Sequence, residues 1–284
     1  MRESNFDLPG ADLAWCPGCG DFKILEALKI ALEELDLKPE DVTVVSGIGQ
    51  AAKTPHFMKC NFLNGLHGRA LSHATGVKAA NPSLTVLAIG GDGDMYGEGG
   101  NHFLHTIRRN PNITNLVYDN MVYGLTKGQA SPTSPKGMTT PIQVRGVASD
   151  PVNPLALALV QGATFVARAF SGNLDHTVKI MKAAIGHRGY SLVDIFQPCV
   201  SFNKINTFKW FKDNTYILED HDQTDRTAAM ELAMRTDYPL GILYCQEGKP
   251  TFEDNLGIYG DDTKPLFLKE GSQEALRAIV DSLS

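Results

Sequence analysis

Oxygen-bearing side chains follow two neighbouring apolar segments, where an α/β protein can hold a metal ion. Gly91-Asp92-Gly93 comes directly after one segment, and Asn120 comes after the next. Mg²⁺ prefers carboxylate and amide oxygens, usually combined with phosphate oxygens. The glycines let the backbone approach a diphosphate closely. The glycine-rich turn at residues 96–100 opens a helix whose first amides can bind a phosphate. Together these features predict a magnesium–diphosphate site.

Glycines of this kind also have two simpler interpretations. Most isolated Gly-Asp-Gly segments are only tight turns, and glycine-rich loops also occur in dinucleotide sites. Gly91, Gly93 and Gly97 miss the Gly-x-Gly-x-x-Gly spacing, so we expect no nicotinamide cofactor. The strand before Asp92, the helix start after it and the later Asn120 favour the metal site over a bare turn.

The cysteines form a second group with possible redox or metal chemistry. Trp15-Cys16-Pro17-Gly18-Cys19 holds a Cys-x-x-Cys pair, which suits a redox dithiol, a zinc site or an iron–sulfur cluster. A thioredoxin-type pair follows a buried strand, and a zinc finger has two further ligands at short spacing; neither feature is evident. An iron–sulfur cluster needs thiolates that can come from distant parts of the chain. Five cysteines are also too sparse to indicate a disulfide scaffold.

Hydrophobic periodicity predicts the elements that position these residues. Apolar, β-branched segments alternate with helical patterns, which indicates an α/β fold with a largely parallel sheet covered by helices. The expected strands cover residues 42–48, 84–89, 113–118, 164–170, 191–196 and 240–245, and the expected helices cover 21–37, 100–109, 174–185, 224–235 and 273–283. Ligands of such sheets bind beyond the carboxyl ends of the strands, where the motifs above lie.

The overall composition limits the class of protein. The 284 residues are 43% hydrophobic and 20% charged, which predicts a packed core. We expect residues 1–218 to carry the cofactor sites and residues 219–284 to form an extension packed on them. A net charge of −6 gives no excess of basic residues that would indicate nucleic-acid binding. No apolar run is long enough to span a membrane, and residues 1–9 lack the apolar centre of a signal peptide, so a cytoplasmic location is expected.

The motifs around Asp92 and Asn120 resemble the thiamine-diphosphate signature. Together with Gly99-Gly100-Asn101-His102-Phe103 and the segment Leu125-Thr126-Lys127-Gly128-Gln129, they resemble the β subunits of 2-oxoacid:ferredoxin oxidoreductases. The resemblance extends over residues 15–218. It implies the thiamine-diphosphate-binding fold, and it implies thiamine diphosphate, Mg²⁺ and a [4Fe–4S] cluster as cofactors.

The resemblance also assigns roles to individual residues. Asp92 and Asn120 would give side-chain oxygens to Mg²⁺, and Val122 its backbone carbonyl. Gly93 and Asp94 would face the diphosphate through their backbone. The other residues expected to bind the cofactor are Ile48, Gly49, His67, Gly91 and Leu125.

Two of the implied residues would act on the substrate. His67 would donate a hydrogen bond to a phosphate or to the developing enolate-like intermediate, although a purely structural histidine is nearly as common. Lys127 occupies a place that the resemblance associates with 2-oxoglutarate. Its ammonium could pair with the distal carboxylate of a dicarboxylic oxoacid. Most loop lysines, however, are simply solvated.

The cluster ligands implied by the resemblance depart from the family pattern at one place. Cys16, Cys19 and Cys199 match it, but Gln50 stands where relatives usually have the remaining cysteine. Either Cys60 replaces that ligand, or Gln50 or another group fills the position, or the cluster is lost. Because iron in such clusters prefers thiolate, we expect Cys60 to be the fourth ligand. Cys245 is expected to be a small buried residue.

The function implied by the resemblance is oxidative decarboxylation of a 2-oxoacid, with 2-oxoglutarate favoured. Coenzyme A would take the acyl group, and electrons would pass through the cluster to ferredoxin. In this family the reaction can also run in reverse and fix CO₂. An α subunit would supply the acid that activates thiamine, so this chain alone would be incomplete. The alternatives are a non-redox thiamine decarboxylase or synthase, and an electron-carrying subunit without catalysis.

Overall fold

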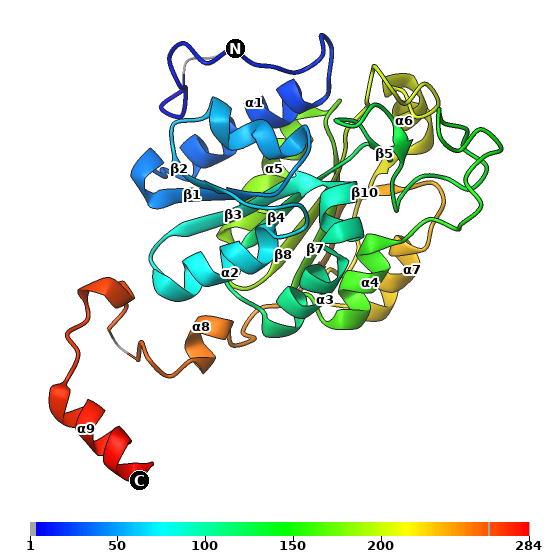
Figure 1. Ribbon diagram of the computed structural model, residues 1–284. Helices are drawn as coiled ribbons and strands as arrows, with labels where there is room; N and C mark the ends of the chain where they lie inside the picture. The colour runs from blue at the N-terminus through cyan, green and yellow to red at the C-terminus, as the bar shows by residue number, and fades with distance from the viewer. Residues whose placement is uncertain (1–3, 261, 284) are drawn as a thin grey trace.

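The computed structural model describes residues 4–260 and 262–283 and has helices on both faces of a central sheet (Figure 1). Within these residues, eight strands form the sheet in the order β2-β1-β3-β4-β8-β7-β10-β9. Their bounds are β1 Val42–Ser46, β2 Asn61–Asn64, β3 Thr85–Gly91, β4 Thr114–Asp119, β7 Phe165–Phe170, β8 Ser191–Phe196, β9 Tyr216–Ile217 and β10 Pro239–Cys245. A separate hairpin pairs β5 (Val122–Tyr123) with β6 (Gln129–Ala130).

The sheet is parallel from β2 through β7, and β10 runs antiparallel to β7. Every residue of β1, β4, β7 and β8 is buried, as expected for strands covered on both faces. The prediction of a largely parallel α/β sheet is therefore confirmed.

Two layers of helices bury the faces of the sheet. Helices α1 (Asp21–Glu34) and α5 (Leu174–Gly186) pack together on one face, and α2 (Ala70–Ala80), α3 (Gly100–Arg109), α4 (Pro154–Gln161) and α7 (Arg226–Ala233) cover the other (Figure 1). The remaining helical segments are α6 (Phe208–Asn214), α8 (Phe252–Asn255), α9 (Gln273–Ser282), the 3₁₀ turns Pro39–Asp41, Ala51–Phe57 and Leu266–Leu268, and the π-helix Gly93–Glu98.

The helix after β3 begins earlier than expected. The sequence predicts a turn at residues 96–100, but π-helical turns run from Gly93 to Glu98 and lead directly into α3. The amide of Gly99 donates to the carbonyl of Asp94 at 2.9 Å, a wide turn that is typical of functional sites. The first backbone amides of this helix therefore belong to the residues directly after Asp92.

The sequence pattern also missed several short elements. Strand β2 is exposed at all four residues, so it has no apolar alternation to reveal it. Helix α4 is apolar on nearly every side, with Leu157 and Val160 exposed, so it lacks the polar face on which a periodicity prediction depends.

The two parts of the C-terminal segment differ in packing. Leu243 of β10 and Ala229 of α7 are fully buried in the core, and the expected boundary at residue 218 falls beside β9, which pairs with β10. In contrast, α9 buries none of its residues and lies away from the sheet (Figure 1). Among the described residues, no helix combines the length and the apolar character needed to cross a membrane.

This contrast predicts different effects on stability. Ending the chain after Gly271 should change the free energy of unfolding by less than about 0.5 kcal/mol, because no residue of α9 is buried. Leu243→Ala should cost about 2–5 kcal/mol, because Leu243 is fully buried. Denaturant titration measures both variants, and an equal loss of stability in the two would contradict this description of the packing.

Candidate functional site

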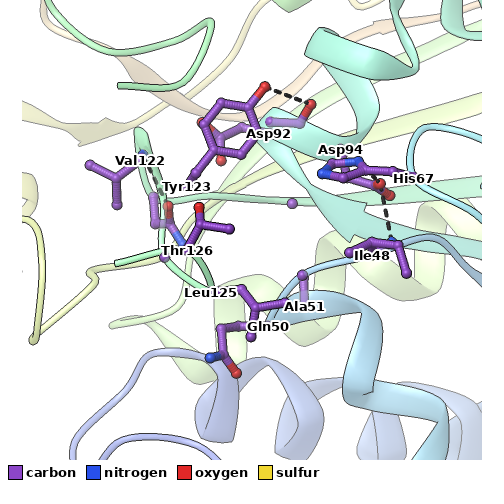
Figure 2. Close-up of a pocket in the computed structure, with 15 residues that line it drawn as sticks. Ile48, Gln50, Ala51, His67, Asp92, Asp94, Val122, Tyr123, Leu125 and Thr126 are labelled. Carbon is purple, nitrogen blue, oxygen red and sulfur yellow. Dashed lines mark hydrogen bonds and ion pairs between the residues drawn. The ribbon is translucent and has the colours of Figure 1, made fainter. Parts of the chain in front are cut away.

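The carboxyl ends of the parallel strands bring the expected cofactor residues to one cavity. Gly91 pairs with Tyr118 and Asp119 pairs with Phe196, so the residues after β3, β4 and β8 lie side by side. The cavity has about 510 Å³ of empty space, part of it open to solvent. All ten residues expected to bind the cofactor line it (Figure 2): Ile48, Gly49, His67, Gly91, Asp92, Gly93, Asp94, Asn120, Val122 and Leu125.

Asp92 lines this cavity and belongs to a group of buried acids. Its Oδ2 accepts a hydrogen bond from Thr133 Oγ1 at 2.6 Å, and the same hydroxyl lies 2.9 Å from Asp119 Oδ1. Burial raises the pKa of Asp92 to about 6. Burial, and then repulsion from Asp194 and Asp92, hold the pKa of Asp119 well above its usual range. Arg168 Nε lies 3.6 Å from Asp194. A divalent cation on Asp92 would offset the remaining negative charge.

Asn120 and Val122 face the same cavity because the chain turns sharply between them. Met121 has φ +59° and is buried, while its two neighbours both line the cavity. The Asn120 Oδ1 atom accepts from the amide of Val122 at 3.1 Å, and its Nδ2 donates to Gln197 Oε1 at 2.9 Å. These contacts orient the Asn120 side chain. The oxygen and amide donors of the site therefore fit a magnesium–diphosphate group.

A close approach between Gly93 and Tyr123 shapes the wall of the cavity. A Cβ on Gly93 would lie 2.3 Å from the Tyr123 ring, so only glycine fits there. The Tyr123 hydroxyl donates to Glu98 Oε2 at 3.0 Å. Tyr123 had no expected role, although its place directly after Val122 in the motif pointed to it. The Thr133 contact could be seen only in the folded chain.

Asp94 ties three loops together beside the cavity. Its Oδ1 accepts from the amides of Gly68 and Ile48, at 2.7 and 3.1 Å, and lies 2.7 Å from His67 Nδ1 (Figure 2). This contact leaves Nε2 of His67 as the ring nitrogen that can meet a bound group. A Cβ on Gly47 would lie 2.0 Å from Asp94 Oδ2, so the loop after β1 requires glycine there.

Lys127 is not among the residues that line the cavity. It is exposed and has φ +76° in the turn between β5 and β6. Its amide donates to the carbonyl of Gly124 at 3.2 Å, and Leu125 and Thr126 of the same turn reach the cavity. The fold thus places Lys127 one residue beyond the cavity rim.

A second cavity brings three of the four expected cluster cysteines together. Cys16, Cys19 and Cys199 line it, with about 340 Å³ of empty space. Gln197 Nε2 donates to Cys19 Sγ at 3.2 Å, and Gly18, with φ +81°, closes the turn between the first two cysteines. The walls are shared with the first cavity, because Gln50, Asn120 and Gly124 line both. Soft sulfur donors from separate loops fit an iron–sulfur cluster.

Cys60 lies outside this cavity, so the structure does not bring it together with the other three expected cluster ligands. It packs against the core beneath α1. Its neighbour Asn61 pairs with Thr43 near the start of β1, which is roughly 10 Å from the carboxyl end of that strand at about 3.3 Å per residue. Burial raises the pKa of the Cys60 thiol to about 11.

Comparisons with known proteins place the first cavity within a thiamine-binding domain. Residues 43–195 match the family described as "Thiamine pyrophosphate enzyme, C-terminal TPP binding domain". Residues 199–261 match the family of the C-terminal part of the pyruvate ferredoxin oxidoreductase β chain. The chain is 46% identical to the β subunit of 2-oxoacid:ferredoxin oxidoreductase 1 of Aeropyrum pernix, over 85% of this chain and 80% of that protein.

This chain belongs to the β subunits of the 2-oxoacid:ferredoxin oxidoreductases. It is also 43% identical to the 2-oxoglutarate oxidoreductase subunit KorB of Mycobacterium tuberculosis, over 68% of this chain and 52% of that protein. The solved 2-oxoglutarate:ferredoxin oxidoreductase of Magnetococcus marinus, with 2-oxoglutarate, coenzyme A and succinyl-CoA bound, superposes with a TM-score of 0.91 at 38% identity, covering 99% of this chain and 96% of that one.

Membership of this family settles several broader points about the β subunit. It carries a thiamine-diphosphate-binding domain and is a component of an oxidoreductase complex. A β subunit implies a partner subunit. The prediction of the family from the motifs around Asp92 and Asn120 is confirmed.

The contact between Gly93 and Tyr123 gives a test of the cofactor cavity. Gly93→Ala should weaken binding of thiamine diphosphate about tenfold or more, because the added methyl must displace the Tyr123 ring. Gly100→Ala is the matched control, because a Cβ there meets nothing within 4 Å. Calorimetric titration of the complex with thiamine diphosphate and Mg²⁺ measures both affinities. Equal affinities in the two variants would show that this wall does not contact the cofactor.

Proposed function

We propose that the β subunit binds thiamine diphosphate, Mg²⁺ and an iron–sulfur cluster, and that with an α subunit it oxidatively decarboxylates a 2-oxoacid, 2-oxoglutarate above all. The observation that carries this proposal is the shared wall between the two cavities, one lined by Asp92 and Asn120 and the other by three cysteines. A thiamine site directly beside a cluster site suits a reaction that releases electrons one at a time.

The residues of the first cavity have separate tasks in this proposal. Asp92, Asn120 and the carbonyl of Val122 hold Mg²⁺, and the amides of Gly93 and Asp94, at the start of the π-helix, face the diphosphate. His67, braced by Asp94, donates through Nε2 to a phosphate or to a developing oxyanion. When bound, thiamine diphosphate supplies the carbanion chemistry of decarboxylation.

The second cavity holds the cluster through Cys16, Cys19 and Cys199. Burial and the nearby Asp21 raise the pKa of the Cys19 thiol well above its usual range, so a thiol there is uncharged until a metal displaces its proton. Gln197 donates to Cys19 and accepts from Asn120, and so links the two sites. A cluster held there would supply one-electron transfer to ferredoxin.

The cavity by itself is catalytically incomplete. Its lining acids are Asp92 and Asp94 among the described residues, and the first is assigned to Mg²⁺ while the second braces His67. The acid that activates thiamine therefore comes from the α subunit. In this proposal, residues 1–218 carry both cofactor sites. The residues that line the two cavities all lie at or before Phe202, which supports this division.

We propose 2-oxoglutarate and coenzyme A as the substrates. A dicarboxylic oxoacid places its distal carboxylate where Lys127 can approach it, and coenzyme A accepts the acyl group. The solved relative with 2-oxoglutarate and succinyl-CoA bound supports this choice. The same chemistry run in reverse fixes CO₂, and we place the complex in the cytoplasm with ferredoxin.

The cluster proposal predicts which cysteines retain iron. We expect about four irons per β subunit, with matching sulfide, in the complex purified without oxygen. Cys199→Ser and Cys16→Ser should lose most of this iron, because both thiols line the cavity. Cys60→Ser and Cys245→Ser are matched controls outside it and should keep it. Iron at background level in the unaltered complex would reject the ferredoxin-linked function.

The role of Lys127 predicts a change confined to dicarboxylic substrates. Lys127→Ala should raise KM for 2-oxoglutarate about tenfold, the lower end for a lost contact between charged groups, and leave KM for pyruvate or 2-oxobutyrate unchanged. Lys136→Ala is the control, because Lys136 already pairs with Asp150 at 2.9 Å. Steady-state kinetics of the complex compare the variants, and an equal rise in KM for both substrate classes would remove Lys127 from substrate selection.

A further inference from the structure

Three thiols surround the cysteine cavity, and a four-iron cluster has four corners to fill. Cys16 and Cys19 come from the loop before α1, and Cys199 comes from the loop after β8. The other two cysteines of the chain do not line this cavity: Cys60 lies near the start of β1, and Cys245 lies beside His187 at the far end of β10. The fourth corner therefore needs a donor other than cysteine, or none.

Gln50 is placed to be that donor. It lies in the loop after β1, which provides a third wall of the cavity. Its Oε1 atom is buried and accepts no hydrogen bond from the described residues. A buried carbonyl oxygen without a hydrogen-bond partner is unfavourable, so binding of a ligand at this oxygen would be stabilising. A metal ion is a suitable partner, because it accepts electron density from a carbonyl oxygen.

The backbone of Gln50 is held firmly while its side chain is not. Trp15 Nε1 donates to the Gln50 carbonyl at 2.9 Å, and Trp15 itself is buried edge-to-face against Phe22 and Phe57. The same tryptophan directly precedes Cys16. This contact therefore fixes Gln50 relative to the first two cysteines. Figure 2 shows the Gln50 side chain directed away from His67 and Asp92.

Other side chains on the wall also carry oxygens. Those of Asn120 and Gln197 already accept hydrogen bonds. Both carboxylate oxygens of Asp21 are buried without a hydrogen-bond partner among the described residues, but Asp21 is poorly placed for the fourth corner. It is 1% exposed and begins α1. Its carboxyl group lies against the Cys19 thiol, two residues earlier in the same loop. A metal bond from Asp21 would therefore fall at the corner that Cys19 already holds.

We propose that the side-chain oxygen of Gln50 ligates the fourth iron of a site-differentiated cluster, on the side that faces the thiamine cavity. This inference rests on the proposed function, because it requires the cluster. A neutral amide in place of a thiolate makes the cluster less negative, which raises its reduction potential. It also leaves one iron more weakly held than the other three.

The test compares Gln50→Cys and Gln50→Ala with the unaltered complex, purified without oxygen. On mild ferricyanide oxidation the unaltered cluster should lose one electron and release the fourth iron as Fe²⁺, leaving a three-iron cluster with its own paramagnetic resonance signal. Gln50→Cys should retain all the iron and show a lower reduction potential. Gln50→Ala should be isolated with about three irons per cluster, already in the three-iron form.

Each outcome distinguishes this inference from the function on which it rests. Four firmly held irons and an identical spectrum in Gln50→Ala would overturn the ligand role while leaving the cluster intact. The same would follow if Asp21→Asn, and not Gln50→Ala, released the fourth iron. No iron in the unaltered complex would instead reject the proposed function itself. Melting temperatures measured in parallel identify any variant whose iron loss follows from unfolding.

Discussion

The common edge at which β1, β3, β4 and β8 end is the constraint on which the rest of the structure depends. Parallel strands deliver their carboxyl ends to one side of a sheet, and here that side receives residues from four separate loops. Gln197 shows the result most directly: it is fully buried, accepts from Asn120 and donates to Cys19. One side chain thus connects the magnesium donors to the cluster donors.

Buried carboxyl groups are the second feature of this edge of the sheet. Asp92, Asp119 and Asp194 are all buried, and burial raises the pKa of each. Arg168 offsets part of this charge and lies 5.0 Å from the centre of the Phe196 ring. Such a group is costly without a cation, so the same acids that lower the stability of the fold favour a bound metal. Cofactor binding and stability are coupled at this point.

The two cavities use the chain differently. The thiamine cavity is built at the ends of neighbouring strands, and all ten residues expected to bind the cofactor line it. The cysteine cavity is assembled from four segments that are distant in the chain, and three cysteines and Gln50 line it. Two of these segments are tied to one another, because Trp15, which precedes Cys16, donates to the carbonyl of Gln50.

The sequence alone determined the parallel sheet and the family, and it singled out Asp92, Asn120, Cys16, Cys19 and Cys199, which the fold brings to two cavities, because buried strands and short motifs leave local patterns. It could not place Cys60, which the pairing of Asn61 with Thr43 carries away from the cluster edge. Nor could it find the contact of Thr133 with Asp92 or the bridge made by Gln197. Those depend on strand order: β8 follows β7 in the chain but lies beside β4, and local patterns do not encode which strands become neighbours.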